Sequence, residues 1–295
     1  MRRIVPIVLD MVRIAVFTHG RVDTGRSERI REILEECYSR LPNDLMLVEL
    51  HLFSTKSLLT AFLSRERSDL GVSSSEMGEG FFAMHDAWRG VPRILVSLDR
   101  LLELPALVQV GGLRHEAAHS ILHGSPEYYI FPMPPSLAEL GRRFSLSLEV
   151  LTDLLYLLSI AVKDYEATRL LYGGGYVEDQ AEYVQYLLEP SGEEVAAWSL
   201  SRGRAVAELL YLASQFKVLA CASPLLEDNS LKGVIFERMR GAVAHLPDAY
   251  AEPLLELSVD GLKNLGDDTL ENVNYVSELF CGRVAKPLME ARHGG

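Results

Sequence analysis

The chain has 295 residues and a formal net charge of −12, from 41 acidic and 29 basic residues. This length is enough for one large domain or two modest ones. A hydrophobic content of 48% excludes a chain that is disordered over most of its length. An acidic surface repels phosphate, so we expect no nucleic-acid partner.

The cysteines and the apolar runs indicate in which compartment of the cell the protein resides. The three cysteines, Cys37, Cys221 and Cys281, lie far apart, which predicts neither a disulfide framework nor a cysteine-based zinc site. The most apolar run, residues 154–162, is about half as long as a bilayer span. The sequence therefore predicts a cytoplasmic protein with no membrane partner.

The first 110 residues alternate between strand-like and helix-like patterns. We expect strands at residues 12–18, 45–53, 81–88 and 93–98, helices at 27–41 and 57–64, and a loop at 68–80.

From about residue 104 onward the pattern is helical. The expected helices cover residues 104–122, 137–171, 177–188, 193–219, 231–244, 253–263 and 270–285. The fold class is therefore α+β. Residues 1–125 form a segment with a small mixed β-sheet and residues 126–295 a largely helical one, and we expect them to pack together as one compact unit.

The segment 111–124, GGLRHEAAHSILHG, contains the HExxH pattern. On a helix, His115 and His119 lie one turn apart on the same face, where two imidazole nitrogens can hold one Zn²⁺. Glu116 follows the first histidine, so its carboxylate can act as the general base that activates water. We predict His115 and His119 as metal ligands and Glu116 as the catalytic residue.

His123 extends the histidine series by one more turn. On a straight helix it lies about 12 Å from His115 along the axis, too far for both to join one tetrahedral site. We expect His123 to support the site or to have a structural role.

The third ligand has to come from elsewhere, and a carboxylate is the usual partner of such a pair. Glu166 shares an apolar helical stripe with Leu155 and Val162, where an acid is costly unless a positive charge compensates it. Asp164, on nearly the opposite side of the same helix, is the alternative. Pairing of Glu166 with Arg169 is the structural explanation that competes with metal binding.

These residues resemble a known group. HEAAHSILHG at residues 115–124, followed by a buried helix with Glu166, is similar to the zincin metallopeptidases with a glutamate ligand, and to the ImmA/IrrE-type peptidases. It resembles most the uncharacterised archaeal proteins that carry HExxH. The resemblance implies a zincin-like fold, with a small mixed sheet, an active-site helix carrying His115, Glu116 and His119, and a second helix that supplies the third ligand.

In such a fold the strand before the active-site helix binds extended substrate through its open edge. Our candidate is the strand at residues 81–88, in which His85 lines the cleft or has a structural role. An oxyanion stabiliser is also expected, and the sequence leaves five candidates open: Tyr128, Tyr129, Tyr165, Tyr172 and Tyr176.

The leading hypothesis is a zinc metallopeptidase that acts on peptide or protein substrates. Co, Ni or Fe suit the same ligands. The alternative is a non-catalytic or regulatory zincin-like protein, with a structural or latent metal site and C-terminal helices that bind a partner or a second copy of the chain. A third reading, in which the histidines only pack, predicts no metal.

Overall fold

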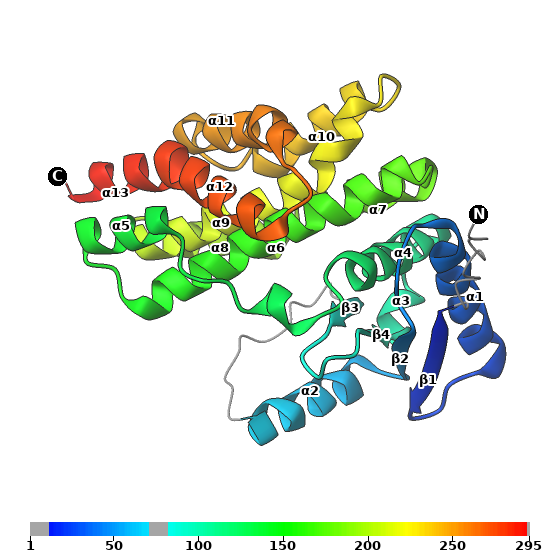
Figure 1. Ribbon diagram of the computed structural model, residues 1–295. Helices are drawn as coiled ribbons and strands as arrows, with labels where there is room; N and C mark the ends of the chain where they lie inside the picture. Colours follow the sequence, from blue (N-terminus) through cyan, green and yellow to red (C-terminus); the bar gives the residue numbers. More distant parts are fainter. Residues whose placement is uncertain (1–11, 71–81, 294–295) are drawn as a thin grey trace, which may run out of the picture. The chain divides into compact units, whose positions relative to one another are not determined.

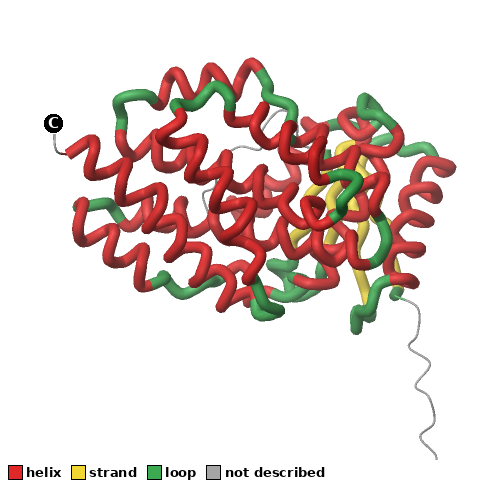
Figure 2. Tube along the Cα trace, turned by 90° about the horizontal axis from the view of Figure 1, so that it is seen from above, coloured by secondary structure: helices red, strands yellow, loops and turns green. Residues whose placement is uncertain are grey.

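The computed structural model describes residues 12–70 and 82–293. The chain divides into two compact units, Met1–Pro126 and Glu127–Gly295, called here the α/β unit and the helical unit. Figure 1 labels the elements of each, with the described strands in the α/β unit, and Figure 2 distinguishes strands from helices by colour. Helices with one small mixed sheet in the described residues confirm the α+β class.

The α/β unit is built on a four-stranded sheet in its described part, with strand order β1-β2-β4-β3. β1, β2 and β4 run parallel, and β3 pairs antiparallel with β4 at one edge. The strands are β1 (Arg13–His19), β2 (Leu47–Phe53), β3 (Ala83–Asp86) and β4 (Arg93–Ser97), and the helices are α1 (Thr24–Arg40), α2 (Lys56–Leu70), α3 (Leu98–Leu101) and α4 (Ala106–Leu122).

The two faces of this sheet carry different helices, because side chains alternate along each strand. Phe53 and Leu95 point to one face and form a buried cluster with Leu59 and Leu63 of α2. His85 pairs with Ile94 on the other face, where its ring stacks on a ring of α4. The sheet thus holds α4 directly against its edge strand.

The expected elements of this unit are present with shifted ends. α1 begins earlier than expected because the Asp23 carboxylate accepts a hydrogen bond from the Arg26 backbone N–H and caps the helix. α2 extends through Leu70, so the expectation of a loop from residue 68 is wrong for its first three residues. Residues 71–80 of that loop, and residue 81 at the start of the third expected strand, lie outside the described residues.

The described part of the helical unit consists of α-helices, short 3₁₀- and π-helical turns, and loops. After the turn η1 (Pro126–Tyr129), the α-helices are α5 (Pro135–Phe144), α6 (Leu148–Gly173), α7 (Val177–Leu187), α8 (Gly192–Ser201), α9 (Ala205–Ala222), α10 (Lys232–Val243), α11 (Asp248–Glu256), α12 (Thr269–Phe280) and α13 (Lys286–His293). Shorter turns are η2 (Ser223–Glu227), η3 (Leu257–Gly261), η4 (Leu262–Asn264) and η5 (Cys281–Ala285).

One continuous apolar core fills this unit. α6 packs along α9, and fully buried side chains such as Leu158, Phe216 and Phe280 lie in the same cluster. Residues 205–227 are long and apolar enough to cross a membrane by composition, but 78% of the most apolar window is buried within the protein. Burial in a helical core accounts for the apolar character of this segment.

Two expected long helices are each interrupted, so both expectations are wrong in the same way. Ser145 adopts a left-handed conformation, φ 54°, that ends α5, and the Ser147 hydroxyl then caps α6. Gly203, with φ 79°, separates α8 from α9. The apolar periodicity continues across both breaks, because each neighbouring helix buries its own stripe in the common core.

The last two expected helices also differ in their bounds. α11 begins at Asp248 instead of residue 253, so Pro253 lies inside the helix and not at its start. The final expected helix continues from α12 through η5 into α13. A π-helical turn holds this continuation together, which periodicity at 3.6 residues per turn does not predict.

Candidate metal centre

α4 carries the HExxH residues, as the sequence predicts. The helix spans Ala106–Leu122 and packs against α1, β3 and β4. Two contacts fix it to α1: the Tyr38 hydroxyl lies 2.7 Å from the Ser120 hydroxyl, and Arg114 pairs with Glu36 at 3.0 Å. The segment is therefore held from both sides within one unit.

The two predicted ligands meet at their outer ring nitrogens. Nε2 of His115 and Nε2 of His119 are 3.1 Å apart, and their rings are nearly perpendicular, at 85°. Two nitrogens on one tetrahedral zinc at roughly 2.0–2.1 Å lie about 3.3 Å apart. The spacing therefore fits a single metal ion held by both rings.

Glu116 projects from the same helix and is only 8% exposed. A buried tyrosine, Tyr38, interacts electrostatically with this carboxylate, and burial raises the pKa of the Tyr38 hydroxyl well above its usual range. Tyr38 therefore stays neutral beside Glu116. No local pattern around the motif predicts this neighbour, because Tyr38 lies on α1, far from the motif in the chain.

His85 of the edge strand lies beside the pair. Its ring is parallel to that of His119, with an interplanar angle of 8° and centroids 6.2 Å apart. β3 has one paired neighbour in the described sheet, β4, which leaves its other edge outside the described ladder. The expected edge strand and its histidine thus lie next to the HExxH helix.

His123 directly follows α4 and is completely buried. Its Nδ1 lies 3.2 Å from Nδ1 of His119, the nitrogen that does not face His115. The expectation that His123 contributes to the site indirectly is consistent with this contact. His119 is therefore flanked by His115 at one nitrogen and by His123 at the other.

The predicted third ligand, Glu166, belongs to α6 in the helical unit. It is 4% exposed, as expected of an acid on the apolar stripe. Its two oxygens accept hydrogen bonds from Asn272, at 2.5 Å, and from Thr269, at 2.9 Å. Burial raises the pKa of Glu166, while these two hydrogen bonds lower it. Both partners lie on α12, about a hundred residues away, where sequence reasoning had no means to find them.

Arg169, the competing partner of Glu166, acts on it through its charge, which lowers the pKa of the Glu166 carboxyl. Its guanidinium donates hydrogen bonds to the carbonyl oxygens of Leu265 and Gly266. Asp164, the alternative ligand, lies on α6 and is half-buried. Both carboxylates therefore remain candidates.

Lys163 precedes Asp164 and was not predicted as a functional residue. Its ammonium lies 4.6 Å from the centre of the Tyr129 ring and donates to the Tyr128 carbonyl oxygen at 3.3 Å. Burial lowers the pKa of Lys163 to about 8. α6 thus carries a buried amine whose charged form the carboxylates of Asp164 and Glu166 stabilise.

The five tyrosines considered as oxyanion stabilisers all belong to the helical unit. Tyr165 and Tyr176 are buried in its interior. Burial is the main cause that raises the pKa of Tyr165, and Tyr172 also has a raised pKa. All five therefore stay candidates for the oxyanion stabiliser.

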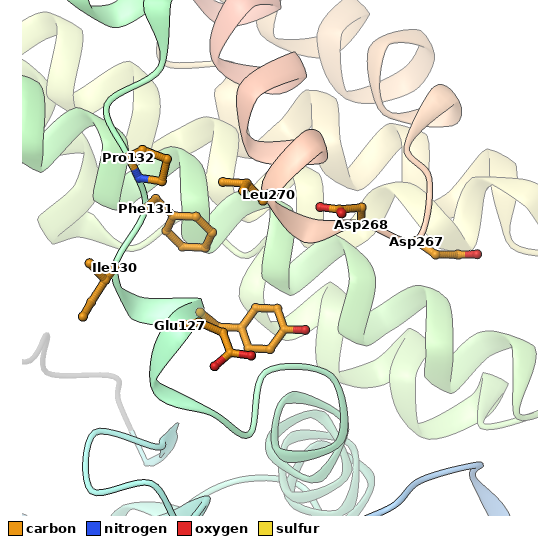
Figure 3. A pocket seen from close by; sticks show the side chains of 8 residues that line it. Glu127, Ile130, Phe131, Pro132, Asp267, Asp268 and Leu270 are labelled. Atoms are coloured by element: carbon orange, nitrogen blue, oxygen red, sulfur yellow. The ribbon is translucent and has the colours of Figure 1, made fainter.

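A hollow of about 560 Å³ also lies in the helical unit (Figure 3). It combines carboxylates with apolar side chains, and is lined by Glu127, Tyr128, Ile130, Phe131, Pro132, Asp267, Asp268 and Leu270. Asp268 already caps α12, by accepting from the Glu271 backbone N–H. Apart from Tyr128, the lining contains no predicted site residue.

Comparison of the chain with known protein families, with curated proteins and with solved structures finds no match.

Proposed function

We propose that the protein is a zinc-dependent metallopeptidase of zincin type. The observation that carries the proposal is the pair of Nε2 atoms of His115 and His119, 3.1 Å apart on one helix, with Glu116 on the same helix. Two neutral imidazoles are a donor set that suits zinc, and the spacing is close to the value expected for one shared ion. The zinc, when bound, supplies a Lewis acid that activates water and polarises the peptide carbonyl.

Glu116 moves the proton in this proposal. A carboxylate one residue after the first ligand accepts a proton from the attacking water and delivers it to the departing amine. The burial of Glu116 strengthens its electrostatic interactions with a bound substrate, because water screens them less. The hydrogen bond between Tyr38 and Ser120 fixes the helix that carries Glu116 to α1.

The edge strand supports a peptide as the substrate. β3 runs antiparallel to β4, and a peptide that adds to its other edge gains backbone hydrogen bonds that do not depend on sequence. His85 lies on this strand next to His119, so a chain bound along β3 passes beside the histidines. This arrangement favours an extended backbone over a compact small molecule.

The third ligand in this proposal is the carboxylate that the sequence predicts, Glu166, with Asp164 as the alternative. Glu166 has the buried position that the apolar stripe predicts, but both of its oxygens already accept hydrogen bonds from α12. Asp164 is half-buried on the same helix. Zinc affinity separates the two: the ligand's amide variant, Glu166→Gln or Asp164→Asn, weakens binding strongly, while the other variant leaves it nearly unchanged. If neither variant weakens binding, α6 does not supply the ligand.

The catalytic test uses Glu116→Gln, with Glu103→Gln as the matched control on the exposed surface. Unfolded casein and a library of quenched fluorescent peptides serve as substrates. We expect the Glu116 variant to lose about 10²–10⁴-fold in rate and to keep its zinc, because a general base is not a ligand. The control should hydrolyse at the wild-type rate.

Two results would contradict the peptidase proposal. The first is a Glu116→Gln variant that hydrolyses as fast as the wild type. The second is a wild-type protein that binds zinc but cleaves none of these substrates, which would favour the non-catalytic zincin-like alternative.

A further inference from the structure

The end of α4 folds a third histidine back onto the metal pair. The helix ends at Leu122, and His123 has φ −128°, outside the helical region, with its backbone N–H still bonded to the His119 carbonyl oxygen. Gly124 follows, and a Cβ there would collide with the Ser120 carbonyl oxygen. The glycine therefore permits the close turn that brings the His123 ring against His119.

The contact joins two ring nitrogens that compete for one proton. Nδ1 of His119 and Nδ1 of His123 are 3.2 Å apart, which is hydrogen-bond distance, so one donates and the other accepts. His123 is completely buried, so water does not compete with it for the hydrogen bond to His119. Which nitrogen carries the proton decides which nitrogen of His119 is free to bind a metal.

Metal binding by His115 and His119 requires one of the two directions of the hydrogen bond between His119 and His123. A histidine that binds metal through Nε2 carries its proton on Nδ1, and an acceptor near Nδ1 stabilises that tautomer. We propose that His123 is a positioning residue: its Nδ1 accepts the Nδ1 proton of His119 and thereby keeps Nε2 of His119 available for metal. This inference rests on the proposed function, because only metal binding at Nε2 makes the direction consequential.

The same logic assigns the neighbouring protons in the metal-free protein. With its proton on Nδ1, His119 is an acceptor at Nε2, so His115 donates from its own Nε2 across the 3.1 Å contact. His123, accepting at Nδ1, carries its proton on Nε2. For metal to bind, His115 then has to transfer its proton from Nε2 to its own Nδ1, whereas Nε2 of His119 is already free.

Three substitutions at one position separate the hydrogen bond from packing. In His123→Asn the amide oxygen occupies nearly the place of Nδ1 and preserves the acceptor. His123→Gln places its oxygen one bond further out, and His123→Leu fills the space with no acceptor. Thermal unfolding of each variant, measured without metal, reports whether packing alone has changed.

The first readout is zinc affinity, measured by competition with a chromogenic chelator. We expect His123→Leu and His123→Gln to bind zinc about 10–100-fold more weakly than the wild type, as losses of supporting hydrogen bonds to metal ligands usually do. His123→Asn should stay within about threefold of the wild type. The d–d absorption of Co²⁺ substituted into the site should change in the Leu variant and not in the Asn variant.

The second readout needs no metal. Long-range ¹H–¹⁵N spectra of the imidazoles in the metal-free protein identify the tautomer of each ring. We expect His119 to be protonated at Nδ1 in the wild type and in His123→Asn, and to lose this preference in His123→Leu.

Equal zinc affinity in the wild type and His123→Leu would overturn the inference, as would an Asn variant that loses as much affinity as the Leu variant. A wild-type His119 protonated at Nε2 would also overturn it. A wild type that takes up no zinc would instead overturn the proposed function, and the inference with it.

Discussion

The two units differ in what their interiors contain. Six of the eight histidines, at positions 19, 51, 85, 115, 119 and 123, belong to the α/β unit, where four of them form a chain of ring contacts around α4. The helical unit instead buries one continuous apolar cluster. The histidines that could hold a metal ion thus lie in the α/β unit, while the helical unit obtains its stability chiefly from hydrophobic burial.

The largest effect is expected in the helical core. Phe216 is completely buried and packs against Phe280, with ring centroids 5.8 Å apart. Phe216→Ala should lower the free energy of unfolding by about 3–5 kcal/mol, because it removes buried area and leaves a cavity. Chemical denaturation measures the loss. Tyr156→Ala, at a side chain that is 58% exposed, should stay within about 0.5 kcal/mol of the wild type.

In the α/β unit, the loss of one buried charged side chain should lower the free energy of unfolding almost as much. Arg93 is 4% exposed and donates hydrogen bonds to the carboxylates of both Glu66 and Asp86. Arg93→Met should cost about 3 kcal/mol, because it leaves the buried Asp86 carboxylate without its cation, while Glu66 keeps its ion pair with Arg89. Arg100→Met, which breaks an exposed pair with Glu103, is the control and should cost less than about 1 kcal/mol. Equal effects of the two variants in denaturation would show that the buried cluster is not a stabilising element.

A substitution in the turn between α5 and α6 is expected to have a smaller effect of opposite sign, a gain in stability. Ser145 has a left-handed backbone, φ 54°, which costs a residue with a side chain roughly 1 kcal/mol relative to glycine. Ser145→Gly should therefore raise the melting temperature. Ser147→Ala, two residues later, should lower it, because the Ser147 hydroxyl caps α6. A loss of stability in Ser145→Gly would contradict this explanation of the break.

The smallest expected effect is a pH dependence of stability due to His51 of β2, whose ring contacts His19 of β1 and Phe62 of α2. Burial lowers the pKa of His51; Glu49 opposes this shift, whereas Arg93 and His19 add to it. The unfolded chain therefore binds a proton at a pH where the folded chain does not. The stabilisation from neutral His51 is complete above its ordinary pKa and is lost as the pH falls toward the lowered value.

His51→Phe tests this linkage, because Phe17, Phe53 and Phe62 already surround the ring. From about pH 7.5 to about pH 5.5, the wild-type melting temperature should fall further than that of the variant. Identical pH dependence in the two proteins would exclude His51 as a contributor.

Local patterns predicted much of the α/β unit, since its elements are short and separated by clear breaks. β1, β2 and β4 follow from runs of apolar and β-branched residues, and α4 follows from the spacing of the histidines. The breaks in the helical unit were missed because they depend on single backbone conformations, at Ser145 and Gly203. A serine in particular gives no sign that it will adopt a left-handed conformation.

The candidate site divides in a similar way. The proximity of His115 and His119 follows from helix geometry alone. The contact of His123 with His119 depends on where α4 ends, and a straight helix predicts only their separation along the axis. Long-range partners, such as Asn272 and Thr269 for Glu166, require the folded core and leave no mark in the local sequence.

The most direct test of the account is metal content by mass spectrometry, on protein purified without a histidine tag. The wild type is compared with His119→Ala and with His245→Ala, a histidine of the helical unit that contacts Tyr211. We expect about one zinc per chain in the wild type and in His245→Ala, and almost none in His119→Ala. A folded wild-type protein that contains no metal, and takes up none from added zinc, would contradict the metal centre on α4.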